Sequence, residues 1–143
     1  MKPLFSYLVN FFIGLLVVNL LVIGVKEIVK RPRPTTILTD YSFPSAHTAN
    51  AFFIAHYLVA GLFIFEKQKK NPNFSNYFLL VGLYVCAVLV GLSRLYYNVH
   101  YLSDVLAGGI IGYLAASILL NNFTKYAFCP KTAKKPNQAR KKR

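Results

Sequence analysis

The sequence predicts an all-α fold, an integral membrane helical bundle with four transmembrane helices. Of the 143 residues, 55% are hydrophobic and only 15% are charged, whereas soluble domains average about 45–50% and about 25%. The apolar residues also form four long blocks instead of periodic stripes. Peptide groups in lipid must be hydrogen-bonded internally, so four such blocks indicate a helical bundle. The length suits one domain, which we place in the membrane over residues 1–124.

The first apolar block, residues 4–25, contains 22 residues and no charge. A helix rises about 1.5 Å per residue, so this length crosses a hydrocarbon core of about 30 Å. A cleaved signal peptide is the alternative interpretation. The block is longer than the roughly 7–15 residues of a signal peptide's apolar region, and no small-residue cleavage site follows it. We therefore predict a transmembrane helix.

The next two spans are predicted over residues 48–65 and 77–94. The charged segment 66–73, which includes a proline, ends the first of them. The uncharged part of the other block has only 16 residues, but it can be extended by Ser93 and Arg94. An arginine at a helix end can place its charge at the membrane interface, so the extended block is long enough to span.

The fourth span is predicted over residues 105–123. It carries Gly108 and Gly112, whose spacing of four allows close contact between helices in lipid. Residues 125–143 form a basic tail, which we expect to be disordered, to lie in the cytoplasm and to attract anionic lipids.

The distribution of Lys and Arg predicts the orientation in the membrane. Alternation of the four spans puts both termini and the 66–76 turn on one side, and residues 26–47 and 94–104 on the other. Of the 17 Lys and Arg residues, 12 lie on the first side and 5 on the second. Positive charge gathers on the cytoplasmic side, so we expect a multi-pass protein of the cell (inner) membrane with both termini cytoplasmic.

The composition also excludes some chemistry. There are four acidic residues, Glu27, Asp40, Glu66 and Asp104, too few to build a carboxylate cage for two metal ions. The two cysteines, Cys86 and Cys129, lack the spacing of zinc sites or redox pairs. We expect no metal, no cofactor and no nucleic-acid partner.

The first outward segment combines positive charge with a helix start. Residues 26–34 form a basic run, and its prolines predict an extended exit from the first helix. Ser45 is the expected N-cap of the second helix, whose free N–H groups attract anions, and His47 follows in the first turn. Taken singly, these features are typical of a basic helix end and an interfacial histidine. His56, nine residues after His47, is rotated by half a turn and is excluded from the site.

The second outward segment contains His100 and Asp104. If the fourth helix begins near Asn98, the two residues lie one turn apart on one face, and the carboxylate can hold the imidazole. The alternative is that Ser103 caps a later helix, which leaves His100 in the loop. Three tyrosines of this segment, Tyr96, Tyr97 and Tyr101, are typical of an interfacial aromatic belt.

Alternation alone brings these segments to one side of the membrane at one depth. Together they supply cations, a hydroxyl, helix-start amides, two histidines and a carboxylate, which suit phosphoryl transfer without a metal.

At these residues the sequence resembles the type 2 phosphatidic acid phosphatase family, also called lipid phosphate phosphatases, which shares its site with vanadium-dependent haloperoxidases. The family has three motifs: lysine, six residues, Arg-Pro; Pro-Ser-Gly-His; and Ser-Arg, five residues, histidine, three residues, aspartate. The matching residues are Lys26 with Arg33-Pro34, Pro44-Ser45-Ala46-His47, and Ser93-Arg94 with His100 and Asp104.

The resemblance implies a role for each matched residue. His100 attacks phosphorus to form a phosphohistidine, Asp104 orients its imidazole, and His47 gives a proton to the leaving group. The residues that hold the phosphoryl oxygens are Lys26, Arg33, Ser45, Ala46 through its amide, and Arg94. The implied substrate is the phosphomonoester or diphosphate of a lipid that stays in the bilayer, hydrolysed at the outer interface.

The sequence departs from the family pattern in two ways. Ala46 stands where the family has glycine; its amide can still reach phosphate, so we expect activity with a tighter pocket. Members commonly have six membrane helices, and four are predicted here. A partner subunit or a second copy of the chain is therefore a candidate to cover the exposed surface.

Two rival functions and the substrate stay open. A vanadate-dependent oxidation would use the same residues, but that group is soluble, and four membrane spans argue against it. A non-catalytic protein that binds anionic lipids through its tail is the other rival. The sequence does not distinguish among phosphatidate, phosphatidylglycerol phosphate, polyprenyl diphosphate and lipid A as substrates.

Overall fold

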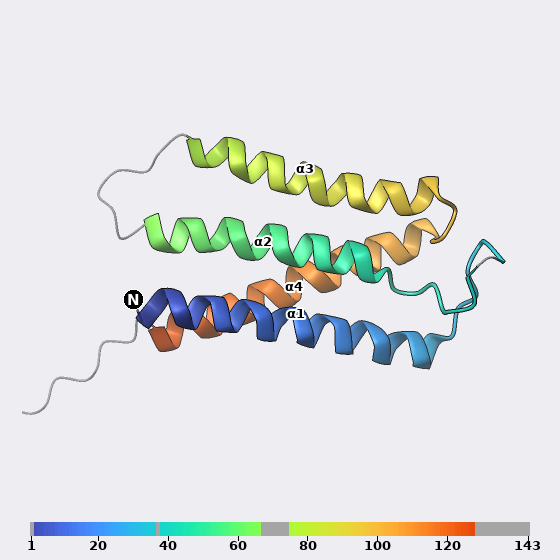
Figure 1. Cartoon of the computed structure of the whole chain (residues 1–143), viewed down its shortest axis with the longest axis horizontal. Helices are drawn as coiled ribbons and strands as arrows, with labels where there is room; N and C mark the ends of the chain where they lie inside the picture. The colour runs from blue at the N-terminus through green and yellow to red at the C-terminus, as the bar shows by residue number, and fades with distance from the viewer. Residues whose placement is uncertain (1, 37, 67–74, 128–143) are drawn as a thin grey trace, which may run out of the picture.

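A computed structural model describes residues 2–36, 38–66 and 75–127 of the chain. These residues form four helices and no strand: α1 (Lys2–Val29), α2 (Ala46–Glu66), α3 (Ser75–Tyr96) and α4 (Leu102–Ala127). The helices run side by side as an elongated bundle (Figure 1). The predicted all-α class is confirmed.

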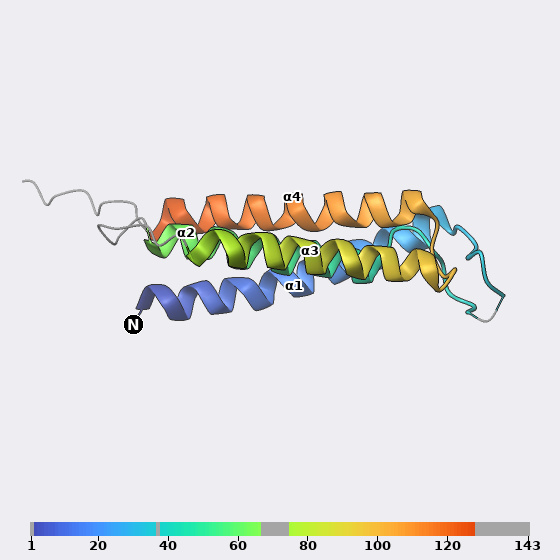
Figure 2. The same ribbon diagram turned by 90° about the horizontal axis from the view of Figure 1, so that it is seen from above.

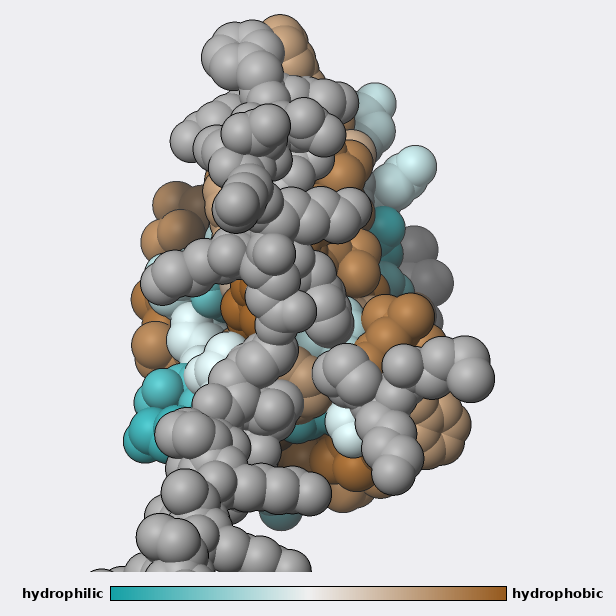
Figure 3. Space-filling model, turned by 90° about the vertical axis from the view of Figure 1, so that its left-hand side faces the viewer, coloured by the Kyte–Doolittle hydropathy of each residue, from teal (hydrophilic) through white to brown (hydrophobic). Residues whose placement is uncertain are grey.

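All four helices contain a stretch long and apolar enough to span a membrane: Leu4–Val29, Ala46–Ile64, Phe78–Tyr96 and Leu102–Lys125. Their outer faces carry large exposed hydrophobic side chains, among them Phe12, Leu89 and Ile110. Seen from the end that carries the N-terminus, the visible flanks of the described bundle are mostly hydrophobic (Figure 3). An apolar surface of this kind is suited to contact with lipid chains. The chain is a multi-pass membrane protein.

The helices extend beyond the predicted spans. α1 continues to Val29, because nothing in the stretch after residue 25 breaks a helix, and α4 continues to Ala127. Residues 128–143, most of the predicted basic tail, lie outside the described residues, so the predicted disorder and lipid binding of the tail stay predictions.

The closest packing in the bundle joins α2 to α4 through two glycines. A Cβ atom added at Gly108 would lie 2.5 Å from the backbone oxygen of Ser45, and one added at Gly112 would collide with the backbone of Ala49. The two helix backbones therefore touch directly. This is the close contact that the spacing of the glycines predicts.

Polar pairs inside the bundle fix how the helices face one another. Asn19 of α1 and Asn50 of α2 exchange amide hydrogen bonds of 3.2 and 3.0 Å. His56 of α2 is 2.7 Å from the Tyr84 hydroxyl of α3 and 3.0 Å from the Ser117 hydroxyl of α4. Both ring nitrogens of His56 are thus satisfied within the bundle, as expected for a histidine outside the site.

The connection between α1 and α2 and the connection between α3 and α4 lie at the same end of the bundle. The N-terminus lies at the opposite end (Figures 1 and 2). Alternation of the spans predicts this arrangement, with both connections at one end of the bundle.

The α2–α4 contact leads to a stability prediction. We expect Gly112→Ala to lower the free energy of unfolding by about 1–3 kcal/mol, because the helices must separate to admit the methyl group. Gly82 on α3 has nothing within 4 Å of an added Cβ, so Gly82→Ala is the matched control. Unfolding in detergent followed by circular dichroism measures both variants. Equal midpoints would contradict the direct backbone contact.

Candidate active site

The basic segment after α1 turns sharply and is tied back to the bundle. Lys30 adopts a left-handed backbone conformation with φ of 48°, which ends the helix. The chain then leaves through two prolines. Ser42 donates its backbone N–H to the Arg31 oxygen at 2.8 Å and its hydroxyl to the Pro32 oxygen at 3.1 Å. These bonds hold the segment over the ends of the helices.

The start of α4 is set by Asp104. The helix begins at Leu102, and the Asp104 carboxylate accepts the backbone N–H of Tyr101 at 2.9 Å, an N-terminal cap made by an acidic residue in the first turn. The hypothesis that the helix begins near Asn98 is wrong, since Asn98 has a φ of 54° and is not helical. Ser103 is not the cap either. His100 lies in the loop, and its contact with Asp104 depends on how this loop folds.

His100 is buried between an acidic and a basic partner. It is 4% exposed, and its Nδ1 is 3.5 Å from Asp104 Oδ2. Its Nε2 is 3.1 Å from Nη1 of Arg33. A guanidinium can only donate, so Nε2 presents its lone pair and Nδ1 carries the proton toward the carboxylate. The Nε2 lone pair thus faces Arg33, on the side from which the basic groups approach.

Burial lowers the pKa of the His100 imidazole below its ordinary value of 6.5, and the charge of Arg33 lowers it further. The nearby Asp104 opposes this shift but does not reverse it. The ring is therefore neutral at pH 7. A neutral imidazole is the form that can act as a nucleophile.

The first motif brings two cations together through an acidic residue that the sequence analysis missed. Asp40 accepts hydrogen bonds from Arg33 Nε at 2.7 Å, from Arg33 Nη2 at 2.6 Å and from Lys26 Nζ at 3.2 Å. The bond from Arg33, with the contribution of Lys26, holds the pKa of the Asp40 carboxyl well below its usual range. The sequence does contain a sign of this role, since Asp40 is the one acidic residue between the basic run and the second motif.

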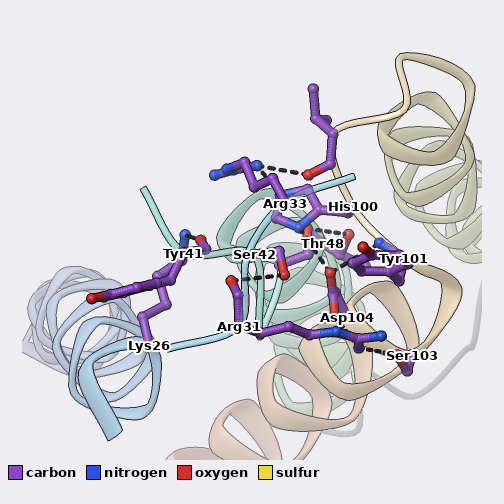
Figure 4. A network of polar contacts seen from close by, with 12 residues as sticks. Lys26, Arg31, Arg33, Tyr41, Ser42, Thr48, His100, Tyr101, Ser103 and Asp104 are labelled. Carbon is purple, nitrogen blue, oxygen red and sulfur yellow. Dashed lines mark hydrogen bonds and ion pairs between the residues drawn. The ribbon is translucent and has the colours of Figure 1, made fainter. Parts of the chain in front are cut away.

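The sequence analysis also missed Arg31. Its Nη1 donates to Asp104 Oδ1 at 2.9 Å and to the Ser103 hydroxyl at 2.6 Å, and its guanidinium lies 4.0 Å from the centre of the Tyr101 ring. In Figure 4 Arg33 reaches the histidine–aspartate pair from the side of His100, and Arg31 reaches it from the side of Asp104.

The second motif lies at the start of α2. Ser45 is fully buried, and its hydroxyl accepts the Thr48 N–H at 3.5 Å and lies 3.0 Å from the Thr48 hydroxyl. The predicted N-cap is confirmed. The Ser45 N–H donates to the backbone oxygen of Asp104 at 3.0 Å, which joins the starts of α2 and α4. Ala46 is the first residue of α2.

His47 and Arg94 lie at the same end of the bundle without bonding directly to His100. His47 is exposed, and it lies within electrostatic range of three cations, Arg94, Arg33 and Lys26. Arg94 is in the last turn of α3 and, with four neighbours from the two connections, lines a cavity of about 330 Å³. The structure thus places every residue of the three motifs at one end.

The charges of this site favour an anion. The site contains four cations, Lys26, Arg31, Arg33 and Arg94, and only two carboxylates, Asp40 and Asp104. Helix-start amides of α2 add further donors. In the described part of the chain, no three His, Cys, Asp or Glu side chains group closely enough to hold a metal ion.

An apolar groove runs down the bundle from this end, between α3 and α4. It has a volume of about 430 Å³ and is lined almost entirely by apolar atoms. Leu95 and Val105 line it where it meets the site, next to Arg94 and Asp104 in the chain, and Gly109 lies deeper in it. We call it the α3–α4 groove.

Comparisons with known proteins agree on one family. The model of the PAP2 superfamily matches residues 4–127. Phosphatidylglycerophosphatase B of Bacillus subtilis is 39% identical over 97 residues, which are 62% of this chain and 44% of that protein. Human dolichyldiphosphatase 1 is 35% identical over 101 residues, 64% of this chain and 42% of that protein. The chain thus spans less than half the length of these relatives.

A solved structure is similar as well. The crystal structure of the first transmembrane PAP2 type phosphatidylglycerolphosphate phosphatase from Bacillus subtilis superposes with a TM-score of 0.65 at 28% identity. The match covers 85% of this chain and 60% of that one.

The surroundings of His100 lead to a prediction about its titration. In NMR spectra of the protein in detergent, we expect the His100 ring to titrate below pH 6.5. Arg33→Gln should move this titration to higher pH, since it removes a charge that disfavours the protonated ring. Lys30→Gln, which removes a charge that does not act on His100, is the control. An unchanged titration in Arg33→Gln would contradict the assigned geometry.

Proposed function

This chain belongs to the PAP2 superfamily, and on that premise we propose that it is a membrane phosphatase that hydrolyses the phosphomonoester or diphosphate of a lipid. The reaction needs no metal and proceeds through a phosphohistidine. The observation that carries the proposal is His100, a buried neutral imidazole whose Nε2 faces Arg33 and whose Nδ1 faces Asp104.

In the first step Arg33 Nη1 moves its hydrogen bond from His100 Nε2 to a phosphoryl oxygen, and the freed lone pair of Nε2 attacks phosphorus. A nitrogen–phosphorus bond forms as the bond from phosphorus to the lipid oxygen breaks. Asp104, beside Nδ1, stabilises the positive charge that develops on the ring, as a carboxylate does for other catalytic imidazoles. His47, exposed beside the site, gives a proton to the departing lipid oxygen.

In the second step water hydrolyses the phosphohistidine. His47, now neutral, takes a proton from the water as it attacks phosphorus. The nitrogen–phosphorus bond breaks, phosphate leaves and His100 returns to its neutral state. Each histidine thus has one role per step, and protons and charges balance over the cycle.

The basic residues hold the phosphoryl oxygens during both steps. Lys26, Arg33 and Arg94 neutralise the charge of the group, and charge-assisted hydrogen bonds of this kind are stronger than neutral ones. The Ala46 amide and the Ser45 hydroxyl complete the set. The hydroxyl first has to turn away from Thr48.

The membrane setting favours a lipid over a soluble phosphate ester. The site lies at the ends of spanning helices, so a bound phosphate stays in the headgroup layer. The apolar α3–α4 groove below it is suited to a hydrocarbon chain. Relatives are named for a phosphatidylglycerophosphate and for a dolichyl diphosphate, which supports this class without selecting one substrate.

The charge distribution supports a site on the outer face of the cell membrane. Alternation of the spans along the sequence assigns 5 of the 17 Lys and Arg residues to the side that carries the site and 12 to the other side. The five include the cations assigned to phosphate, so their presence on a translocated side has a functional explanation. Both termini are then cytoplasmic.

Replacement of the nucleophile tests the reaction. We expect His100→Ala to reduce phosphate release from a lipid phosphate in detergent by at least about 1000-fold, since no other group can form the intermediate. His56→Gln, at a histidine outside the site, is the control and should retain activity. EDTA should not inhibit the parent enzyme. Phosphate release by His100→Ala at the parent rate would refute the mechanism, and inhibition by EDTA would indicate a metal enzyme.

Cysteine labelling in intact cells tests the orientation. After removal of Cys86 and Cys129, single cysteines are placed at Thr36 and at Ser75, at opposite ends of the bundle. A membrane-impermeant maleimide should label the cysteine at position 36 and leave that at position 75 unlabelled until the cells are lysed. The reverse pattern would place the site on the cytoplasmic side.

A further inference from the structure

Asp104 is a fully buried carboxylate, and its charge needs compensation. Its side chain is 0% exposed, and a charge removed from water is costly unless it is paired and hydrogen-bonded. His100 cannot supply the opposite charge in the resting enzyme, because burial and Arg33 keep the ring neutral. In the described part of the chain, the one permanent cation within bonding distance of this carboxylate is Arg31.

Arg31 also determines which way the carboxylate faces. Its guanidinium bonds to Oδ1 at 2.9 Å, and the other oxygen, Oδ2, accepts the Tyr101 N–H and faces His100 Nδ1. If Oδ1 lost its partner, the carboxylate could rotate or bind water and the alignment of Oδ2 with the ring would no longer be fixed.

Further contacts hold both the guanidinium and the backbone of Arg31 in place. It bonds to the Ser103 hydroxyl at 2.6 Å and stacks at 4.0 Å on the ring of Tyr101, a favourable arrangement for a planar cation. The Arg31 backbone oxygen accepts the Ser42 N–H at 2.8 Å. Arg31 thus joins the segment after α1 to the first turn of α4.

We propose that Arg31, one of the six residues that the first motif leaves unspecified, is a positioning residue that compensates the buried charge of Asp104 and keeps Oδ2 turned toward His100. The inference rests on the proposed phosphatase function. It separates the basic residues of the site into two groups: Lys26, Arg33 and Arg94 bind phosphate, whereas Arg31 acts on the reaction only through Asp104.

If Arg31 acts only through Asp104, its replacement should change kcat much more than KM. Arg31→Ala should lower kcat by about 10- to 100-fold, as loss of a partner that orients a catalytic imidazole does elsewhere. The KM for a lipid phosphate should stay within about threefold, because Arg31 does not contact the phosphate. Arg31→Lys should retain part of the activity. Lys30→Ala removes the same charge one residue earlier, at an exposed position, and should behave like the parent.

Chemical rescue separates positioning from folding. The Arg31 side chain is 35% exposed, so guanidinium ions can enter the space left in Arg31→Ala. Millimolar guanidinium chloride should restore a large part of kcat, and sodium chloride at the same concentration should not. A higher KM with unchanged kcat would make Arg31 a phosphate-binding residue and overturn the proposal. A loss of kcat that guanidinium does not restore, in a variant that unfolds like the parent, would also overturn it.

A second measurement does not depend on turnover. In NMR spectra the His100 Nδ1 resonance should shift in Arg31→Ala and return on addition of guanidinium. If the parent chain releases no phosphate from any lipid but this shift and its recovery are seen, the proposed function fails and the positioning role stands. If the His100 resonance is the same in the parent and in Arg31→Ala, the positioning role fails.

Discussion

Direct contact between the backbones of α2 and α4 is the constraint on which the site depends. Gly108 and Gly112 leave no room for a side chain between the helices, so the two helix starts lie side by side. The hydrogen bond from Ser45 N–H to the Asp104 oxygen follows from this approach. Ser45 of the second motif and Asp104 of the third, almost 60 residues apart in the chain, thereby become neighbours, and the segment after α1 covers them.

The charges of the site are balanced in two separate groups. Asp40 holds Lys26 and Arg33 with a carboxylate that is 59% exposed, so water or another anion can compete for these cations. The Asp104 carboxylate is 0% exposed, although its partner Arg31 is 35% exposed, so another anion cannot take the place of this carboxylate. An exposed ion pair is weak because water screens it, whereas a buried one is costly to disrupt. A carboxylate paired with a cation is thus exchangeable in one place and fixed in the other.

The sequence predicts the spans, the shared end and the motif residues, because length, hydropathy and spacing depend on local sequence alone. It does not predict where α4 begins, since that depends on the Asp104 carboxylate bonding to the Tyr101 amide. The role of Arg31 is hidden for a similar reason. Within the basic run every cation looks alike, and the one that meets Asp104, 73 residues later, is selected by tertiary packing.

The different caps of α2 and α4 have an electrostatic consequence. Each helix start carries a partial positive charge of about half an elementary charge from its aligned peptide dipoles. At α4 the carboxylate of Asp104 offsets it, but at α2 the cap is the neutral hydroxyl of Ser45. The field of α2 is therefore left for a bound anion. Because no side chain titrates to produce it, this part of the attraction does not change with pH.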